Sequence, residues 1–260
     1  MIDAEAPAQG HGFSRDELIR YARQLSLKGF GVEAQARLKA SSVLLVGAGG
    51  LGAPVALYLA AAGLGRMSVI DADRVELGNL QRQILYDTGA LDKPKIGVLR
   101  TRLTSLNPEV RLSARPERLD EGNAKKLIRG HDLVIDGTDN LQTRRAVGQA
   151  CRETGVPLLS GAVEQFSAQI AYLPGPPCLT CLWPDLDHAE APDCAEAGIL
   201  GAVTGMTGSA MALEAIKALA RLEGGDEPRL LIGDLMTHHW QRIDLSGLAQ
   251  CAICSGSKAV

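Results

Sequence analysis

The sequence is poor in aromatic side chains, and it lacks both long apolar runs and a marked excess of one charge. Phe, Trp and Tyr make up 3% of the 260 residues, and 27 basic residues stand against 30 acidic ones. No apolar run reaches the length of about 18 residues that a membrane-spanning helix needs. The first 12 residues lack the apolar stretch of a secretory signal peptide. We therefore expect a cytoplasmic protein that neither enters a membrane nor binds nucleic acid through bulk positive charge.

Small apolar residues and glycine dominate instead. Hydrophobic residues make up 46% of the sequence, charged residues 22%, and 29 residues are glycine. This composition excludes wholesale disorder and suits tightly packed α/β layers better than a β-sandwich. The length allows one large domain or two small ones, and the absence of a low-complexity linker favours one. We expect a loose tail over residues 1–12 and a single domain over 13–260, divided into halves at 13–160 and 161–260.

Short apolar strands alternate with helical segments along the chain. Ser14 and Glu17 have the spacing of a capping box at the start of a helix that runs to residue 27. The expected strands cover residues 43–46, 67–70, 110–114, 133–135, 157–160, 167–173, 230–233 and 239–245. Further helices are expected over residues 32–40, 53–62, 94–106, 123–129, 141–154 and 199–220. This order predicts a Rossmann-like, doubly wound α/β sheet, mostly parallel, that closes with antiparallel C-terminal strands.

A glycine-rich turn follows the first expected strand and opens a helix. Residues 47–52 read Gly-Ala-Gly-Gly-Leu-Gly, which fits the pattern G-x-G-x-x-G. Glycines let the backbone approach a phosphate, and the helix start offers free N–H groups. Asp71, at the end of the next strand, can accept hydrogen bonds from ribose hydroxyls. The turn alone does not distinguish NAD from ATP. The residues of the turn that we assign to the nucleotide are Gly47, Gly49, Gly50, Leu51 and Gly52.

Two cations and a carboxylate follow in loops after the strands. Arg82 and Lys95 can neutralise phosphates and Asp139 can hold Mg²⁺, a combination that favours a triphosphate over a dinucleotide. Taken singly, Arg82 or Lys95 is explained as well by a solvated surface charge, and Asp139 by the N-cap of the next helix. The Tyr-x-x-x-Lys pair of many nicotinamide reductases is missing after every tyrosine. Three further polar residues complete the predicted nucleotide site: Asp73, Asn79 and Asn140.

Four of the six cysteines form two C-x-x-C pairs, Cys178 with Cys181 and Cys251 with Cys254. This is the spacing of metal ligands, and four thiolates suit tetrahedral Zn²⁺. The pairs are too far apart in the sequence for a compact zinc ribbon, so the fold must bring two knuckles together. A redox-active C-x-x-C is the alternative, but it needs a thioredoxin-like setting, and the sequence does not contain one. We predict a closed zinc site that ties a proline-rich loop to the C-terminus.

The other two cysteines differ in their surroundings. Cys194 lies between Asp193 and Glu196, in a proline-rich, acidic loop that begins at residue 174. Acidic neighbours disfavour the thiolate, so the local sequence alone indicates an inert thiol. Cys151 lies on an expected helix and is predicted to be part of the core.

Several motifs in a fixed order resemble the ThiF/MoeB/HesA family, bacterial relatives of ubiquitin-activating enzymes. Besides the glycine turn they are Arg20-Tyr21-x-Arg23-Gln24, Asn79-Leu80-Gln81-Arg82-Gln83, Lys93-Pro94-Lys95 and Thr138-Asp139-Asn140. The resemblance covers nearly the whole chain, from about Arg20 to Cys254. It implies ATP-dependent adenylation of the C-terminal Gly-Gly carboxylate of a ubiquitin-like sulfur carrier. A sulfur donor, such as a cysteine desulfurase, then converts the activated end to a thiocarboxylate.

The resemblance also implies roles for single residues. It gives the glycine turn to the phosphates and Arg23 to the site of a neighbouring subunit, which makes the enzyme a homodimer with composite sites. Cys194 matches a cysteine that bonds covalently to the carrier, and the paired cysteines match a structural zinc site. The remaining assignments are Asp71 to the ribose, Asn79, Arg82 and Lys95 to phosphates, and Asp139 to Mg²⁺ and catalysis.

The resemblance assigns nucleotide binding to residues 13–160, and carrier and zinc binding to residues 161–260. Within the family, the segment Cys181-Leu182-Trp183-Pro184 followed by Cys194 favours the thiamine pathway, with adenylation of the molybdopterin-synthase carrier as the alternative. A NAD(P)-binding oxidoreductase is the rival from another class, supported by the glycine turn and Asp71 alone. A tRNA-modifying dehydratase of the same superfamily would need a basic RNA-binding face, which the net charge does not indicate.

Overall fold

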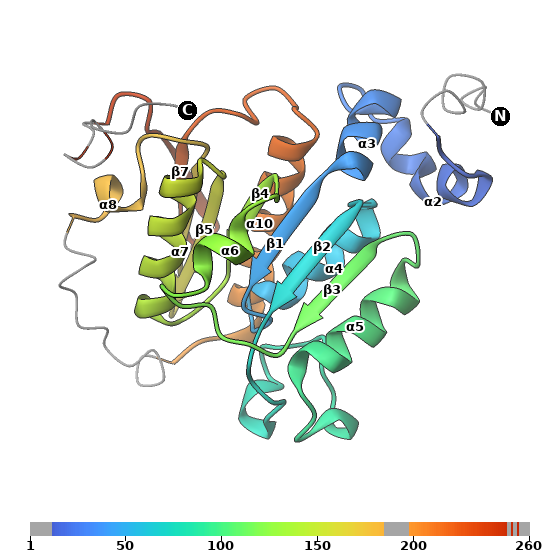
Figure 1. The fold of residues 1–260 in the computed structure, drawn as a ribbon, viewed down its shortest axis with the longest axis horizontal. Helices are drawn as coiled ribbons and strands as arrows, with labels where there is room; N and C mark the ends of the chain where they lie inside the picture. Colours follow the sequence, from blue (N-terminus) through green and yellow to red (C-terminus); the bar gives the residue numbers. More distant parts are fainter. Residues whose placement is uncertain (1–11, 185–197, 249–250, 252–253, 255–260) are drawn as a thin grey trace.

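The computed structural model describes residues 12–184 and 198–248, together with Cys251 and Cys254. One eight-stranded sheet forms its centre, in the order β3-β2-β1-β4-β5-β6-β7-β8 (Figure 1). Strands β1 to β5 run parallel, and β6 to β8 continue the sheet antiparallel, which confirms the predicted architecture. The strands are β1 Ser42–Val46, β2 Arg66–Ile70, β3 Arg111–Arg115, β4 Leu133–Asp136, β5 Leu158–Glu164, β6 Ser167–Leu173, β7 Arg229–Asp234 and β8 His239–Asp244.

The strand order reverses direction at β1. The chain adds β2 and β3 on one side of β1, then crosses over and adds β4 and β5 on the other side. In doubly wound sheets ligands bind outside the carboxyl ends of the strands at such a switch point, here beside the loops that follow β1 and β4. The predicted nucleotide residues follow β1, β2 and β4, so the topology gathers them at this edge.

Helices cover both faces of the sheet (Figure 1). Alternate residues of β1 serve the two faces: Leu45 packs with α4, α5 and α10, and Leu44 packs with α6, α7 and α8. Helices α2 and α3 lie at the amino edge and lead into β1. The helices are α2 Arg15–Leu25, α3 Gly31–Ala40, α4 Gly52–Ala62, α5 Lys95–Leu106, α6 Ala124–Ile128, α7 Leu141–Thr154, α8 Leu179–Leu182 and α10 Gly201–Leu219, with the short 3-10 helices η1 Leu77–Asn79 and η2 Thr88–Ala90.

Helices α4 and α10 pack at unusually short range, which explains part of the glycine content. A Cβ added to Gly208 of α10 would clash with Pro54 and with the carbonyl of Leu51 at the start of α4. Thr204, one turn earlier on α10, touches the glycine turn, because a Cβ on Gly50 would lie 3.2 Å from Thr204 Cγ2. Small residues along α10 therefore let this helix lie directly on the turn that precedes α4.

Local sequence signals account for most element boundaries. The capping box is confirmed: the Ser14 amide donates to Glu17 Oε2 at 2.8 Å, and the Glu17 amide donates to Ser14 Oγ at 3.2 Å. Strand β5 is longer than predicted, because residues 161–164 pair with β6 in a hairpin. Helix α8 was not expected from the sequence. Among the described residues, no helix has both the length and the apolar character needed to span a bilayer.

Candidate functional site

The glycine turn lies at the carboxyl end of β1 and is shaped by backbone contact. Gly47 has φ +89°, and a Cβ there would lie 3.2 Å from the carbonyl oxygen of Gly137, in the loop after β4. A Cβ on Gly52 would clash with the carbonyl of Gly47. Helix α4 begins at Gly52 with no side-chain cap and no acidic residue in its first turn. In its first turn the Ala53 amide already donates to the Gly49 carbonyl at 2.9 Å, and Pro54 has no N–H, so the helix start offers an anion mainly the positive end of its dipole.

Two side chains hold the turn through Ala48. Asp71 Oδ2 accepts a hydrogen bond from the Ala48 amide at 2.7 Å, and the Tyr86 hydroxyl donates to the Ala48 carbonyl at 2.8 Å. Asp71 Oδ1 also accepts from the Asp73 amide at 2.8 Å. Burial is the main cause that raises the pKa of Tyr86 above its usual range, and the nearby Asp71 adds to it. Tyr86 was missed in the sequence, because its partner is a backbone carbonyl remote along the chain.

The two predicted phosphate cations are Lys95, the first residue of α5, and Arg82, in the loop after η1. Lys95 Nζ is 2.9 Å from Asp73 Oδ2, and the lysine side chain is 5% exposed while the aspartate side chain is 57% exposed. The alternative that Lys95 is a solvated surface charge is therefore wrong. Arg82 is half-buried, and its guanidinium donates to Asn79 Oδ1 at 2.9 Å and to the Gly78 carbonyl at 3.1 Å. Each predicted cation is thus paired with another predicted site residue.

Asp139 lies in the loop after β4 and is exposed. This loop meets the glycine turn, because a Cβ on Gly47 would lie 3.2 Å from Thr138 Cγ2. The N-cap of α7 is Asn140, whose Oδ1 accepts from the Thr143 amide at 2.9 Å. The alternative that Asp139 caps this helix is therefore wrong, and the Asn140 side chain already has a structural role. The structure brings the turn, Asp71, Asp73 and the Asp139 loop together at the carboxyl edge of the sheet.

Helix α2, which contains Arg23, lies at the amino edge of the sheet, opposite to the carboxyl end of β1 where the glycine turn follows (Figure 1). Helix α2 packs against the far end of α4, where Gln24 Nε2 donates to the carbonyl of Ala62 at 3.0 Å. The Arg23 side chain is exposed there. Within one chain, the structure does not bring Arg23 to the other predicted site residues.

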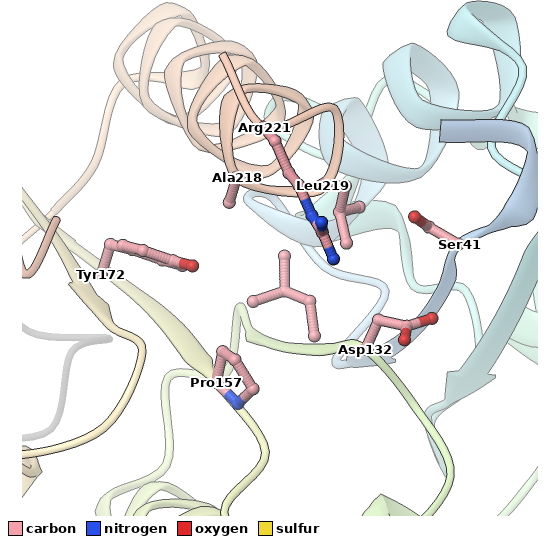
Figure 2. Close-up of a pocket in the computed structure, with 8 residues that line it drawn as sticks. Ser41, Asp132, Pro157, Tyr172, Ala218, Leu219 and Arg221 are labelled. Carbon is pink, nitrogen blue, oxygen red and sulfur yellow. The ribbon is translucent and has the colours of Figure 1, made fainter. Parts of the chain in front are cut away.

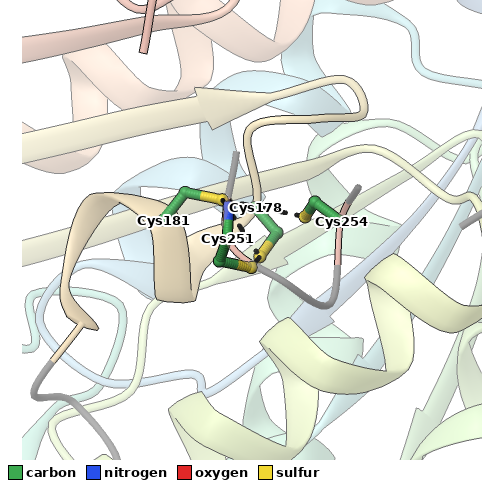
Figure 3. A group of neighbouring side chains, drawn as sticks. All are labelled: Cys178, Cys181, Cys251 and Cys254. Carbon is green, nitrogen blue, oxygen red and sulfur yellow. Dashed lines mark hydrogen bonds between the residues drawn. The ribbon is translucent and has the colours of Figure 1, made fainter. Parts of the chain in front are cut away.

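The two C-x-x-C pairs come together, as the sequence predicted (Figure 3). The Sγ atom of Cys178 lies 3.8 Å from that of Cys181 and 3.9 Å from that of Cys251. The Sγ atoms of Cys181 and Cys254 are 3.7 Å apart. Sulfur atoms at the corners of a tetrahedron around an ion with bonds of about 2.3 Å are about 3.8 Å apart. A disulfide would need a separation of about 2.05 Å. The four thiols therefore form a donor set with the size of a tetrahedral metal site.

Of the two remaining cysteines, the structure describes Cys151. Cys151 is buried on α7 within the core, as predicted, and burial raises the pKa of its thiol. Cys194 lies outside the described residues.

Trp183, in the loop after α8, is partly buried against the core of the α7 face.

A cavity of about 270 Å³ lies at the amino edge of the sheet, away from the glycine turn. Asp132 and Pro157 line it just before β4 and β5, and Figure 2 shows the Arg221 side chain reaching into it from the end of α10. None of the predicted site residues lines this cavity. The candidate nucleotide site is instead the carboxyl edge of the sheet, where the loops after β1 and β4 meet.

The fold and the site define the class of this chain as a doubly wound α/β protein with a glycine-rich turn after β1 and a four-cysteine cluster. Residues 21–254 match the ThiF family model, and the chain belongs to the ThiF family.

Relatives of known name agree with this assignment. The chain is 42% identical over 250 residues to the sulfur carrier protein adenylyltransferase of Thermus thermophilus, covering 93% of this chain and 92% of the relative. It is 40% identical over 247 residues to the sulfur carrier protein ThiS adenylyltransferase of Escherichia coli, covering 94% and 97%. A crystal structure of E. coli MccB with succinimide has a TM-score of 0.77 at 22% identity, covers 95% of this chain and 75% of that one, and shows a shared fold.

Proposed function

We propose that this chain is an ATP-dependent adenylyltransferase that activates the C-terminal Gly-Gly carboxylate of a ubiquitin-like sulfur carrier for thiocarboxylate formation. The observation that carries the proposal is the convergence of the glycine turn, the buried Lys95 and the Asp139 loop at the carboxyl edge, where α4 begins without a side-chain cap. The two relatives above are named as adenylyltransferases of sulfur carriers. An NAD(P)-dependent oxidoreductase would use the turn and Asp71, but it would not need this buried lysine.

The reaction requires alignment and charge neutralisation from the protein rather than a protein nucleophile. The carrier carboxylate attacks the α-phosphorus of ATP, and pyrophosphate leaves. The positive dipole end of α4 and the backbone of the glycine turn, with Lys95 and Arg82, would hold the phosphates. Asp71 would accept from the ribose, although its Oδ2 already accepts from Ala48 in the turn and its Oδ1 from the Asp73 amide. Asp139 would hold Mg²⁺, which adds positive charge beside the phosphates when it is bound.

The pathway follows from the relatives rather than from the candidate nucleotide site. The E. coli relative is named for the carrier ThiS, which favours the thiamine pathway for this chain. The alternative is the carrier of molybdopterin synthase, with the same adenylation chemistry. A cysteine desulfurase, or another sulfur donor, would complete the thiocarboxylate. Direct comparison of the two carriers as substrates separates the two pathways.

The four-cysteine cluster would hold structural zinc. Four thiolates without an open position form a closed site, which suits a structural ion rather than a catalytic one. The cluster joins Cys178 and Cys181, at the N-cap and within α8, to Cys251 and Cys254 near the chain end. Zinc would therefore stabilise the C-terminal half by closing a long loop.

A homodimer would account for the position of Arg23. Because Arg23 lies at the edge opposite to its own glycine turn, it can serve a nucleotide only in the site of a second copy.

Cys194 remains a prediction for a covalent bond to the carrier. Intact mass measurement under adenylating conditions tests it: a carrier adduct that reduction removes, and that Cys194→Ser lacks, is the expected result.

The experiment that tests the proposed function is ATP–pyrophosphate exchange by the purified protein, with and without a carrier that ends in Gly-Gly. Exchange that requires the carrier is the expected result. Mg-ATP should also raise the melting temperature, whereas NAD should not, because only a ligand of the folded state stabilises it. Stabilisation by NAD, with no exchange in the presence of either carrier, would contradict the proposal.

A further inference from the structure

A buried polar network lies directly beneath the Asp139 loop. Its centre is Asp136, the last residue of β4, whose side chain is 0% exposed. The carboxylate accepts four hydrogen bonds, which leaves neither oxygen without donors. The donors are the Thr138 amide at 3.0 Å, Thr138 Oγ1 at 2.6 Å, Ser160 Oγ at 2.8 Å and Arg144 Nε at 2.9 Å.

Arg144 of α7 extends the network to the backbone on both sides. Its Nη2 donates to the carbonyl of Thr138 at 2.8 Å and to the carbonyl of Gly161 at 2.7 Å. One guanidinium therefore joins the end of β4, the loop after it and strand β5. A planar group with several donors fixes direction as well as distance, which the single ammonium of a lysine does not.

Thr138 connects this network to the glycine turn. Its amide, its hydroxyl and its carbonyl are all engaged by Asp136 or Arg144, and its methyl group contacts the glycine turn at Gly47. Every polar group of the residue before Asp139 is thus fixed from below. The exposed carboxylate of Asp139 follows one peptide bond later.

A buried ion pair is costly to desolvate, and an apolar pair of similar volume is often equally stable. The direction that this pair imposes on the Asp139 loop is a function that apolar residues would not provide. Groups that hydrogen-bond to a metal-binding segment from behind orient the ligands and tune the affinity of the site.

We propose that Asp136, Arg144 and Thr138 are positioning residues that set the direction of the Asp139 carboxylate and thereby the affinity of the site for the divalent ion of Mg-ATP. The proposal rests on the proposed function, in which Asp139 holds that ion. None of the three residues needs to touch ATP or the carrier.

The test compares Thr138→Val, which removes the hydroxyl donor but keeps the shape, with Thr138→Ser, which keeps the donor. Binding of Mn²⁺ in the presence of a non-hydrolysable ATP analogue is followed by the EPR signal of the free ion, and the Mg²⁺ dependence of exchange is measured in parallel. Thr138→Val should raise the dissociation constant for Mn²⁺ by about 10-fold. Thr138→Ser should leave that constant at the wild-type value. Arg144→Lys, which retains the charge but loses the fork, should weaken Mn²⁺ binding in the same direction.

The matched control is Thr101→Val on α5, whose exposed hydroxyl donates only within its own helix, to the carbonyl of Gly97. It should leave Mn²⁺ binding unchanged. If Thr138→Val and Arg144→Lys lower only the melting temperature and leave Mn²⁺ binding at the wild-type value, the positioning role is refuted.

The failure of the proposed function has a different signature. Wild-type protein would then show no carrier-dependent exchange, or Asp139→Ala would bind Mn²⁺ as tightly as wild type. If a Thr138 variant does not fold, Ser160→Ala removes a different donor of Asp136 and is judged by the same Mn²⁺ titration.

Discussion

Replacing Lys95 by Met separates the electrostatic role of this residue from its packing. Met keeps most of the apolar stem that α5 buries and removes the ammonium. The lost ion pair involves an Asp73 side chain that is 57% exposed, so water replaces the lysine as its partner. The cost to stability is therefore about 0–1 kcal/mol, and the melting temperature should fall by less than about 4 °C.

Activity should respond far more strongly than stability. The Lys95 ammonium would face negative charge that develops on the phosphates in the transition state, and loss of one such preorganised donor costs a factor of about 10²–10³ in rate. The assay is carrier-dependent ATP–pyrophosphate exchange, with a thermal melt of the same preparation. Lys93→Met is the matched control, since this lysine lies two residues earlier, is exposed, and donates to the carbonyl of Gly89 at 2.8 Å. Exchange by Lys95→Met at the rate of Lys93→Met would refute the reasoning.

Three further predictions concern other parts of the chain. Protein purified without chelator should carry about one zinc ion per chain, and Cys254→Ser should lose both the ion and thermal stability; less than half an equivalent in wild type would contradict the zinc assignment. Mixing and reassembling the inactive variants Arg23→Ala and Asp139→Ala should restore up to about a quarter of wild-type exchange, because half of randomly paired dimers would contain one intact composite site; no recovery would argue against sites shared between subunits. Burial lowers the pKa of His131 below its ordinary value of 6.5, so the neutral ring stabilises the fold above that value and this contribution is lost as pH falls through the lowered pKa. Melting temperatures between pH 7 and pH 5 should therefore fall less in His131→Asn than in wild type, and equal falls would exclude this residue as the cause.

Much of the fold could be predicted because its signals are local. The Gly47–Gly52 turn, the capping box at Ser14 and the alternation of apolar strands with helices each depend on a few neighbouring residues. Hydrophobic period and turn chemistry express such features directly in the sequence. The convergence of the two C-x-x-C pairs was also predictable, because the thiols share a single chemical use.

The supporting residues could not be found in the same way. Tyr86 donates to the backbone carbonyl of Ala48. Because every residue type carries such a carbonyl, the sequence at position 48 does not indicate this contact. Asp136 directly follows the expected strand 133–135, and Arg144 lies within the expected helix 141–154, but neither position in the sequence indicates its partner. Their pairing depends on the crossing of β4 and α7, which is set by tertiary packing rather than by spacing along the chain.

The close contact between α10 and the glycine turn has a mechanical consequence. Helix α10 has 19 residues and is therefore about 28 Å long, so it runs from the carboxyl edge, at Thr204, to the amino edge beside the cavity at Leu219. Gly208 leaves no room for a side chain between α10 and Pro54, so the two helices are packed in direct contact. We therefore expect any opening that releases pyrophosphate and the activated carrier to involve the surrounding loops rather than a separation of these helices.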